Sequence, residues 1–337
     1  MSFQYIKPGR KLPKTIALPP YKTNQYQSPE HYLVRQDLAN AINVALYMNQ
    51  PLLITGEPGT GKTRLAARMA WELGLHGPLV FQTKSTSLST DLFYTYNALA
   101  RFHFAQATQK LIHGAKFIQY NALGQAILLS NTEADIKQIE DNAKTRFILA
   151  KDDPLLTLQK RSIVLIDEID KAPRDFPNDL LNEIEHCSFN IPELNNAVIQ
   201  ANPDYYPVII ITSNSEKHLP DAFLRRCVYY HIVFPEFDEM KAIVSNRLHN
   251  MSFHDTFLQD ALNLFYELRD DKHGIKKKPA TAELLVWLVA LRNQSQTQNP
   301  ITEDKQAVTD TLYSTLIKTK ADLLIAKKVV EKWLSDQ

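Results

Sequence analysis

Eight consecutive residues, 56 to 63, could bind phosphate. They read GEPGTGKT and match the pattern G-x-x-x-x-G-K-[ST] at every required position. In this pattern the glycines let backbone N–H groups approach an anion, the lysine reaches the β- and γ-phosphates, and the hydroxyl binds Mg²⁺. We therefore expect a nucleoside triphosphate to be bound by the following residues: Gly56, Glu57, Pro58, Gly59, Thr60, Gly61, Lys62, Thr63 and Arg64.

A pair of carboxylates follows a second apolar run. Residues 163–166 are apolar, and Asp167 and Glu168 come directly after them. We expect Asp167 to hold Mg²⁺ through water, because Mg²⁺ keeps several waters. Glu168 would orient and polarise the attacking water. Alternatively, Asp167 and Asp170 cap the turn after the strand. Beside a phosphate-binding loop, the pair favours hydrolysis over phosphoryl transfer to a small metabolite.

Two further segments could complete such a site. Asn214 follows another apolar run, and ligands lie at the carboxyl ends of strands in open parallel sheets. Asn214 could hydrogen-bond the γ-phosphate or the attacking water, although an asparagine there is also a common turn residue. Arg225 and Arg226 end a short helical segment. They are either cations that a helix C-terminus favours, or an arginine finger for a neighbouring subunit's γ-phosphate.

The elements that must position these residues alternate along the chain. Apolar and β-branched runs predict strands at the following residues: 51–55, 78–81, 162–166, 207–212 and, more weakly, 229–233. Helical patterns separate the strands, beginning with residues 34–45 and 64–73. Continuous apolar strands that alternate with helices indicate an α/β fold of three layers, in which helices cover both faces of a parallel sheet.

Two segments exceed what such a core requires. The span 84–161 predicts elaborated helical insertions, with helices from Thr90 to about Leu111 and from Leu123 to Leu129, and then a polar stretch at 131–144. The second segment predicts a hairpin, with strands at 188–192 and 196–199 and a turn at 193–195.

The pattern of the chain changes near both ends. Residues 1–29 contain several prolines and basic residues but no acidic residue, which predicts an extended arm. Strand patterns stop near residue 235, and only helices are predicted beyond it: 237–248, 256–268, 281–292, 305–318 and 321–334. We therefore expect a basic arm at 1–29, an αβα core with insertions at 30–235 and a helical lid domain at 236–337.

Composition limits the class of function. Hydrophobic content of 44% and charged content of 22% are typical of a globular protein, and the net charge of +1 gives no general attraction to nucleic acid. No apolar run approaches the roughly 20 residues that span a membrane, and the N-terminus has no secretory pattern. The two cysteines, Cys187 and Cys227, do not have the spacing of metal ligands, and the histidines do not have it either. We expect a cytoplasmic protein without a membrane or nucleic-acid partner.

Four segments in order resemble an AAA+ ATPase: GEPGTGKT, IVLIDEID, ITSN and LPDAFLRRC, followed by a small helical domain. More narrowly, DEIDKAPRDFPNDLLNEIE resembles the MoxR-like branch of the dynein-related type, whose members read DEINRAP and then a helix. The resemblance covers roughly residues 30–335. The hairpin and the insertion after Lys84 are also typical of that branch.

The resemblance implies a ring, usually of six subunits, with ATP and Mg²⁺ at the subunit interfaces. It places the finger on Arg226, whereas Arg225 stands where the family often has Asp and could assist. The family usually has a second sensor arginine in the lid. The comparable position here is Ala282, and Lys278 could substitute. The resemblance also implies chaperone-like remodelling of a separate partner protein, which often bears a von Willebrand factor A domain.

Two other classes of function remain open. One is a regulatory switch in signalling or defence, which assembles on ATP and hydrolyses it slowly. The other is a nucleic-acid motor or loader, which the near-neutral charge disfavours. The rate of ATP hydrolysis and its stimulation by a partner protein would distinguish a switch from a remodelling enzyme. A steep salt dependence of nucleic-acid binding would identify a motor or loader.

Overall fold

The computed structural model describes residues 28–108, 114–147, 159–215, 219–249, 251, 254–295 and 297–336. The predicted arm at 1–29 lies almost wholly outside these residues. The chain divides into two compact units. The αβα unit comprises residues 34–57 and 61–233. The helical unit comprises residues 234–337 together with 58–60 and the described residues before Val34.

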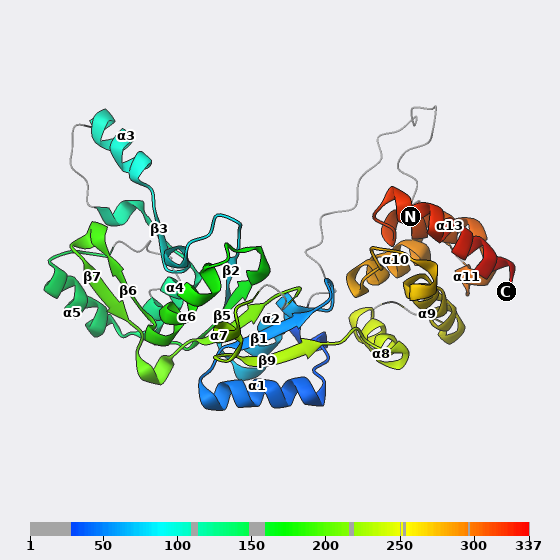
Figure 1. The fold of residues 1–337 in the computed structure, drawn as a ribbon, viewed down its shortest axis with the longest axis horizontal. Coiled ribbons are helices and arrows are strands. Elements are labelled where there is room, and N and C mark those ends of the chain that lie inside the picture. Colours follow the sequence, from blue (N-terminus) through cyan, green and yellow to red (C-terminus); the bar gives the residue numbers. More distant parts are fainter. Residues whose placement is uncertain are drawn as a thin grey trace. The chain divides into compact units, whose positions relative to one another are not determined.

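A five-stranded sheet forms the centre of the αβα unit (Figure 1). Its order is β2 (His76–Gln82), β5 (Ser162–Asp167), β8 (Val208–Thr212), β1 (Leu52–Gly56) and β9 (Val228–Ile232). All four strand pairs are parallel, which confirms the predicted parallel sheet. The inner strands β1, β5 and β8 are almost entirely buried, because continuous apolar runs place apolar side chains on both faces.

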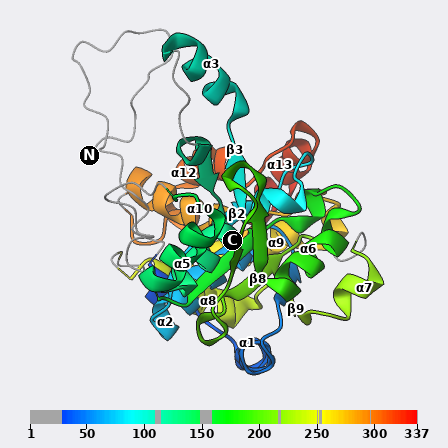
Figure 2. The same ribbon diagram turned by 90° about the vertical axis from the view of Figure 1, so that its left-hand side faces the viewer.

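Helices cover both faces of this sheet (Figure 2). Leu53, Val164 and Ile211 belong to the apolar core that α4 (Ala122–Ser130) and α6 (Phe176–His186) form on one face. Side chains alternate along a strand, so the intervening Ile54 and Leu165 lie on the other face, where α2 (Lys62–Leu73) packs. A further helix, α1 (Gln36–Met48), packs on the edge strand β9.

The first insertion departs from the prediction at its start. The helix expected from Thr90 is wrong there, because β3 (Tyr94–Tyr96) pairs antiparallel with β4 (Ile118–Tyr120) and α3 (Ala98–Thr108) begins only afterwards. Tyrosine and threonine favour a pleated strand. The Asn97 side chain then accepts a hydrogen bond from the N–H of Ala100 at 2.8 Å, which starts the helix. Both views show α3 projecting from its unit (Figures 1 and 2).

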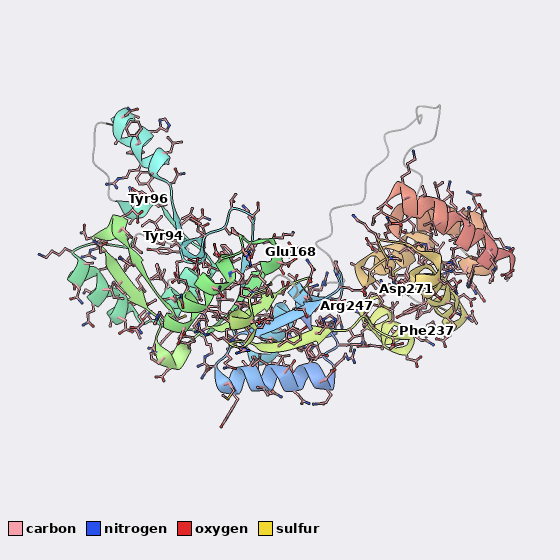
Figure 3. The ribbon with its side chains drawn as sticks, viewed as in Figure 1. Tyr94, Tyr96, Glu168, Phe237, Arg247 and Asp271 are labelled. Atoms are coloured by element: carbon pink, nitrogen blue, oxygen red, sulfur yellow. The ribbon has the colours of Figure 1, made fainter. Side chains whose placement is uncertain are left out.

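The remaining insertions follow the prediction and pack on one another. The polar stretch forms α5 (Glu133–Ala143), and β6 (Ser188–Ile191) and β7 (Ala197–Gln200) form the predicted hairpin. Phe189 stacks on Phe93 with ring centroids 5.0 Å apart. The Tyr94 hydroxyl donates to Glu193 at 3.0 Å. The two insertions therefore share one aromatic cluster, beside the labelled Tyr94 in Figure 3.

The helical unit contains α8 (Phe237–Arg247), α9 (Asp255–Arg269), α10 (Thr281–Gln294), α11 (Pro300–Glu303), α12 (Lys305–Thr315) and α13 (Lys320–Ser335). The short α11 was not predicted, because its four residues are too few for a periodic pattern. Trp287 is fully buried at the centre of a core to which all six helices contribute. Among the described helices, none combines the length and apolar character that a membrane span requires.

Candidate nucleotide site

The glycine-rich loop joins the end of β1 to the start of α2. Gly56 has a φ of 146°, and a Cβ there would lie 2.6 Å from the carbonyl oxygen of Ile232, so a side chain does not fit. Gly61, immediately before α2, has a φ of 92°, in the left-handed region that glycine adopts readily. The loop therefore delivers its backbone to a helix N-terminus, where N–H groups can bind an anion.

Lys62 is buried at the base of this loop, with 7% of its surface exposed. Its ammonium donates to the carbonyl oxygens of Gly56 at 2.7 Å and Glu57 at 3.0 Å, and to the Asn214 side chain at 3.0 Å. Burial lowers the pKa of the Lys62 ammonium, and the carboxylates that follow β5 oppose this effect. Three acceptors match the three ammonium protons. The structure thus fixes the cation that the sequence assigns to the phosphates.

Thr63 and Asp167, the two residues that we expect at Mg²⁺, are in direct contact. The Thr63 hydroxyl donates to the Asp167 carboxylate, at 3.0 Å from Oδ1 and 3.2 Å from Oδ2. Asp167 is 6% exposed. Mg²⁺ prefers oxygen ligands, and a hydroxyl beside a carboxylate supplies two. These residues therefore fit the metal that we predicted for them.

Thr212 is a site residue that sequence reasoning missed. Its hydroxyl donates to Asp167 Oδ1 at 2.6 Å and accepts from the Glu168 N–H at 2.9 Å. One buried side chain on β8 therefore holds both carboxylate-bearing residues at the end of β5. The available signal was a threonine at the end of an apolar strand. That signal is weak, because threonine is common in strands.

Glu168 lies at the carboxyl end of β5 and is labelled in Figure 3. Its backbone is left-handed, with a φ of 58°, which is uncommon for a residue other than glycine. The Lys171 ammonium pairs with Glu168 Oε2, and this hydrogen bond is the main cause that raises the pKa of Lys171. Lys171 was not predicted. Both side chains are more than one-third exposed, so the pair contributes little to stability.

Asn214 lies between Lys62 and Asp170. Its backbone N–H donates to Asp170 Oδ1 at 3.1 Å, and its Nδ2 donates to Asp170 Oδ2 at 3.4 Å. Sequence reasoning considered Asp170 only as a cap for its own turn. Its partner instead comes 44 residues later, at the end of β8. Asp170 therefore connects the turn after β5 to the end of β8.

The two arginines stand apart from this network. They follow α7 (Asp221–Leu224), which the fully buried Phe223 anchors. Arg225 and Arg226 are both exposed, and neither guanidinium forms a hydrogen bond or ion pair within the described ranges. Arg64 is half-buried in the first turn of α2, where burial lowers the pKa of its guanidinium. The roles of these arginines stay predictions.

The predicted lid positions lie in the helical unit. Ala282 is exposed in the first turn of α10, and Lys278 pairs with Asp271 at 2.7 Å. No group of three or more His, Cys, Asp or Glu side chains that could hold a metal occurs among the residues that the structure describes.

A family model with the description AAA domain (dynein-related subfamily) matches residues 51–227, which is more than half of the chain. The chain belongs to this AAA domain family. The matched span begins just before β1 and ends just after α7, so it contains the loop, Asp167, Glu168, Asn214 and both arginines. Membership implies nucleotide binding.

Solved structures give weaker likenesses. One single-residue variant of Thermotoga maritima RuvB is 16% identical, with 89% of this chain and 68% of that chain covered and a TM-score of 0.43. A second Thermotoga maritima RuvB mutant is 16% identical, with 91% of this chain and 72% of that chain covered and a TM-score of 0.44. A crystal structure of the FIGL-1 AAA domain in complex with ADP is 17% identical, with 85% of this chain and 75% of that chain covered and a TM-score of 0.37. No curated protein matches the chain.

Proposed function

We propose that this AAA domain protein hydrolyses ATP with Mg²⁺. The observation that carries the proposal is the arrangement at the carboxyl ends of β1, β5 and β8. Lys62 would hold the β- and γ-phosphates, Thr63 and Asp167 would hold Mg²⁺, and Glu168 would orient the attacking water. Mg²⁺, when bound, would neutralise charge that develops on the phosphates. These are the groups that phosphoryl transfer to water requires.

We further propose that Arg226 acts on the γ-phosphate held by a neighbouring subunit, with Arg225 as an assisting cation. An arginine finger stabilises the charge of the transition state, and a finger that acts in trans must be accessible on the surface. The exposure of both arginines supports this assignment. The resemblance to ring-forming AAA+ proteins supports a homo-oligomer, usually of six subunits.

The proposed task is chaperone-like remodelling of a partner protein in the cytoplasm, as in the MoxR-like branch. The hairpin β6–β7 and the insertion with α3 support this assignment, because both are features of that branch. The partner would be a separate protein, such as one with a von Willebrand factor A domain. Lys278 or another group would take the place of the family's sensor arginine, which is missing at Ala282.

The substitution Glu168→Gln tests the proposal. It keeps the size of the side chain but removes the charge, so ATP should still bind while turnover falls about 100-fold or more. The measurements are ATP affinity and phosphate release for the wild type and the variant. Glu185→Gln, an exposed glutamate on α6, is the matched control and should leave both values unchanged. Equal turnover in Glu168→Gln and the wild type would refute the assignment. Very slow turnover of the wild type that no partner protein stimulates would favour the regulatory switch.

A further inference from the structure

Asn214 has two neighbours of opposite hydrogen-bonding character. On one side is the Asp170 carboxylate, which lies 3.4 Å from Nδ2 and also accepts the Asn214 backbone N–H at 3.1 Å. On the other side is the Lys62 ammonium, 3.0 Å from Oδ1. An asparagine amide has one donor end and one acceptor end, so its direction decides what it can contact.

These neighbours allow only one direction. An ionised carboxylate only accepts hydrogen bonds, and an ammonium only donates them. The NH₂ end must therefore face Asp170, and the carbonyl end must face Lys62. The reverse direction would place two donors against each other at Lys62 and two acceptors against each other at Asp170. Asp170 also fixes the adjacent backbone, so the side chain and the main chain of Asn214 are held by the same carboxylate.

We propose that Asp170 is a positioning residue that commits Asn214 to accept hydrogen bonds in the nucleotide site. This inference rests on the proposed ATP hydrolysis and concerns which end of the Asn214 amide faces Lys62. Phosphate oxygens are acceptors, so the carbonyl end of Asn214 at Lys62 cannot donate to the γ-phosphate, and one N–H of the amide is already engaged at Asp170. Its carbonyl oxygen instead holds the Lys62 ammonium and can accept from the attacking water, which is a donor.

A reciprocal exchange of the two side chains tests this role. In Asp170→Asn/Asn214→Asp, the new amide at 170 can donate to the new carboxylate at 214, and its carbonyl can still accept the N–H of residue 214. The carboxylate at 214 then presents an acceptor to Lys62. Asn214→Asp alone brings two carboxylates together, and Asp170→Asn alone leaves only Lys62 to hold the direction of the Asn214 amide.

We expect each single variant to lower kcat for ATP about tenfold, since hydrogen bonds to charged groups are involved, with KM within about twofold of the wild type. The exchange should restore kcat to within about threefold of the wild type. Asp175→Asn, an exposed aspartate at the start of α6, is the matched control and should change neither constant. Thermal unfolding of every variant shows whether a loss of kcat comes from misfolding.

The outcomes separate this inference from the proposed function. If the wild type hydrolyses ATP but the folded exchange variant is no more active than Asn214→Asp, then an acceptor at 214 is not sufficient and the inference is wrong. A kcat for Asp170→Asn equal to that of the wild type also overturns it. If the wild type itself has no turnover, the proposed hydrolysis fails, and the inference fails with it.

Discussion

Lys62 and Arg226 are two cations that we assign to one reaction, and their surroundings are opposite. Lys62 is 7% exposed and donates to three acceptors of its own unit. Arg226 is exposed, and its guanidinium has no hydrogen bond or ion pair with the part of the chain that the structure describes. The chain therefore fixes one cation by itself and leaves the other accessible to another molecule.

This difference separates two ways of building a site. A buried charge must have partners, because the cost of removing it from water is high, so Lys62 is held wherever the fold forms. An exposed arginine keeps its side-chain freedom, worth up to about 2 kcal/mol, until an anion orders it. Binding of nucleotide should then depend on the first cation, and the chemical step on the second.

The largest effect should come from Lys62→Ala. Loss of the ammonium removes the charge that we assign to the phosphates, so we expect no measurable ATP binding by titration calorimetry. Lys137→Ala, which removes an exposed lysine on α5, should bind ATP as the wild type does. ATP binding retained by Lys62→Ala would contradict the assignment of nucleotide binding to Lys62.

A smaller effect is expected from Arg226→Ala. Turnover should fall on the order of 1,000-fold, the scale of an arginine finger, while ATP affinity and thermal stability stay unchanged. The control is Arg225→Ala, an equally exposed arginine at the same helix end, for which we expect a loss of less than about tenfold because we assign it only an assisting role. Equal losses in the two variants would contradict the assignment of the finger to Arg226.

The smallest effect is expected from Thr212→Val, which tests how the buried part of the site at the end of β5 is held in place. The isosteric change leaves Asp167 and the Glu168 N–H each without one partner, so the free energy of unfolding should fall by about 1–3 kcal/mol. Thr83→Val is the control, because the buried Thr83 hydroxyl has no hydrogen-bond partner among the described residues. It should be neutral or stabilising in denaturant titrations. A similar cost at both positions would show that Thr212 acts only through packing.

The sequence predicts the sheet well because its inner strands are short, continuous apolar runs. The five runs correspond to β1, β2, β5, β8 and β9, and the parallel pairing follows from the helices between them. The loop and the carboxylates at the end of β5 were also recognisable, because each motif is contiguous and has chemistry of its own. Local pattern therefore carries the fold and the first part of the site.

Contacts between distant segments could not be read in this way. Asp170 meets Asn214 across 44 residues, and Thr212 meets Asp167 across 45. No local pattern in either segment specifies these pairs. The same limit explains the error at residues 90–97, because the tyrosines and threonine of β3 form a strand only by pairing with β4, which lies beyond α3 in the sequence.

Mixing two inactive variants tests the shared site most directly. Chains with Arg226→Ala keep Glu168, and chains with Glu168→Gln keep Arg226. In an equimolar random ring, about a quarter of the interfaces would then combine an intact Glu168 with an intact Arg226 from the neighbour. We predict that the mixture recovers ATP turnover toward that fraction of wild-type activity. A mixture that assembles and binds ATP but stays as inactive as its two components would contradict a site completed by a neighbouring subunit.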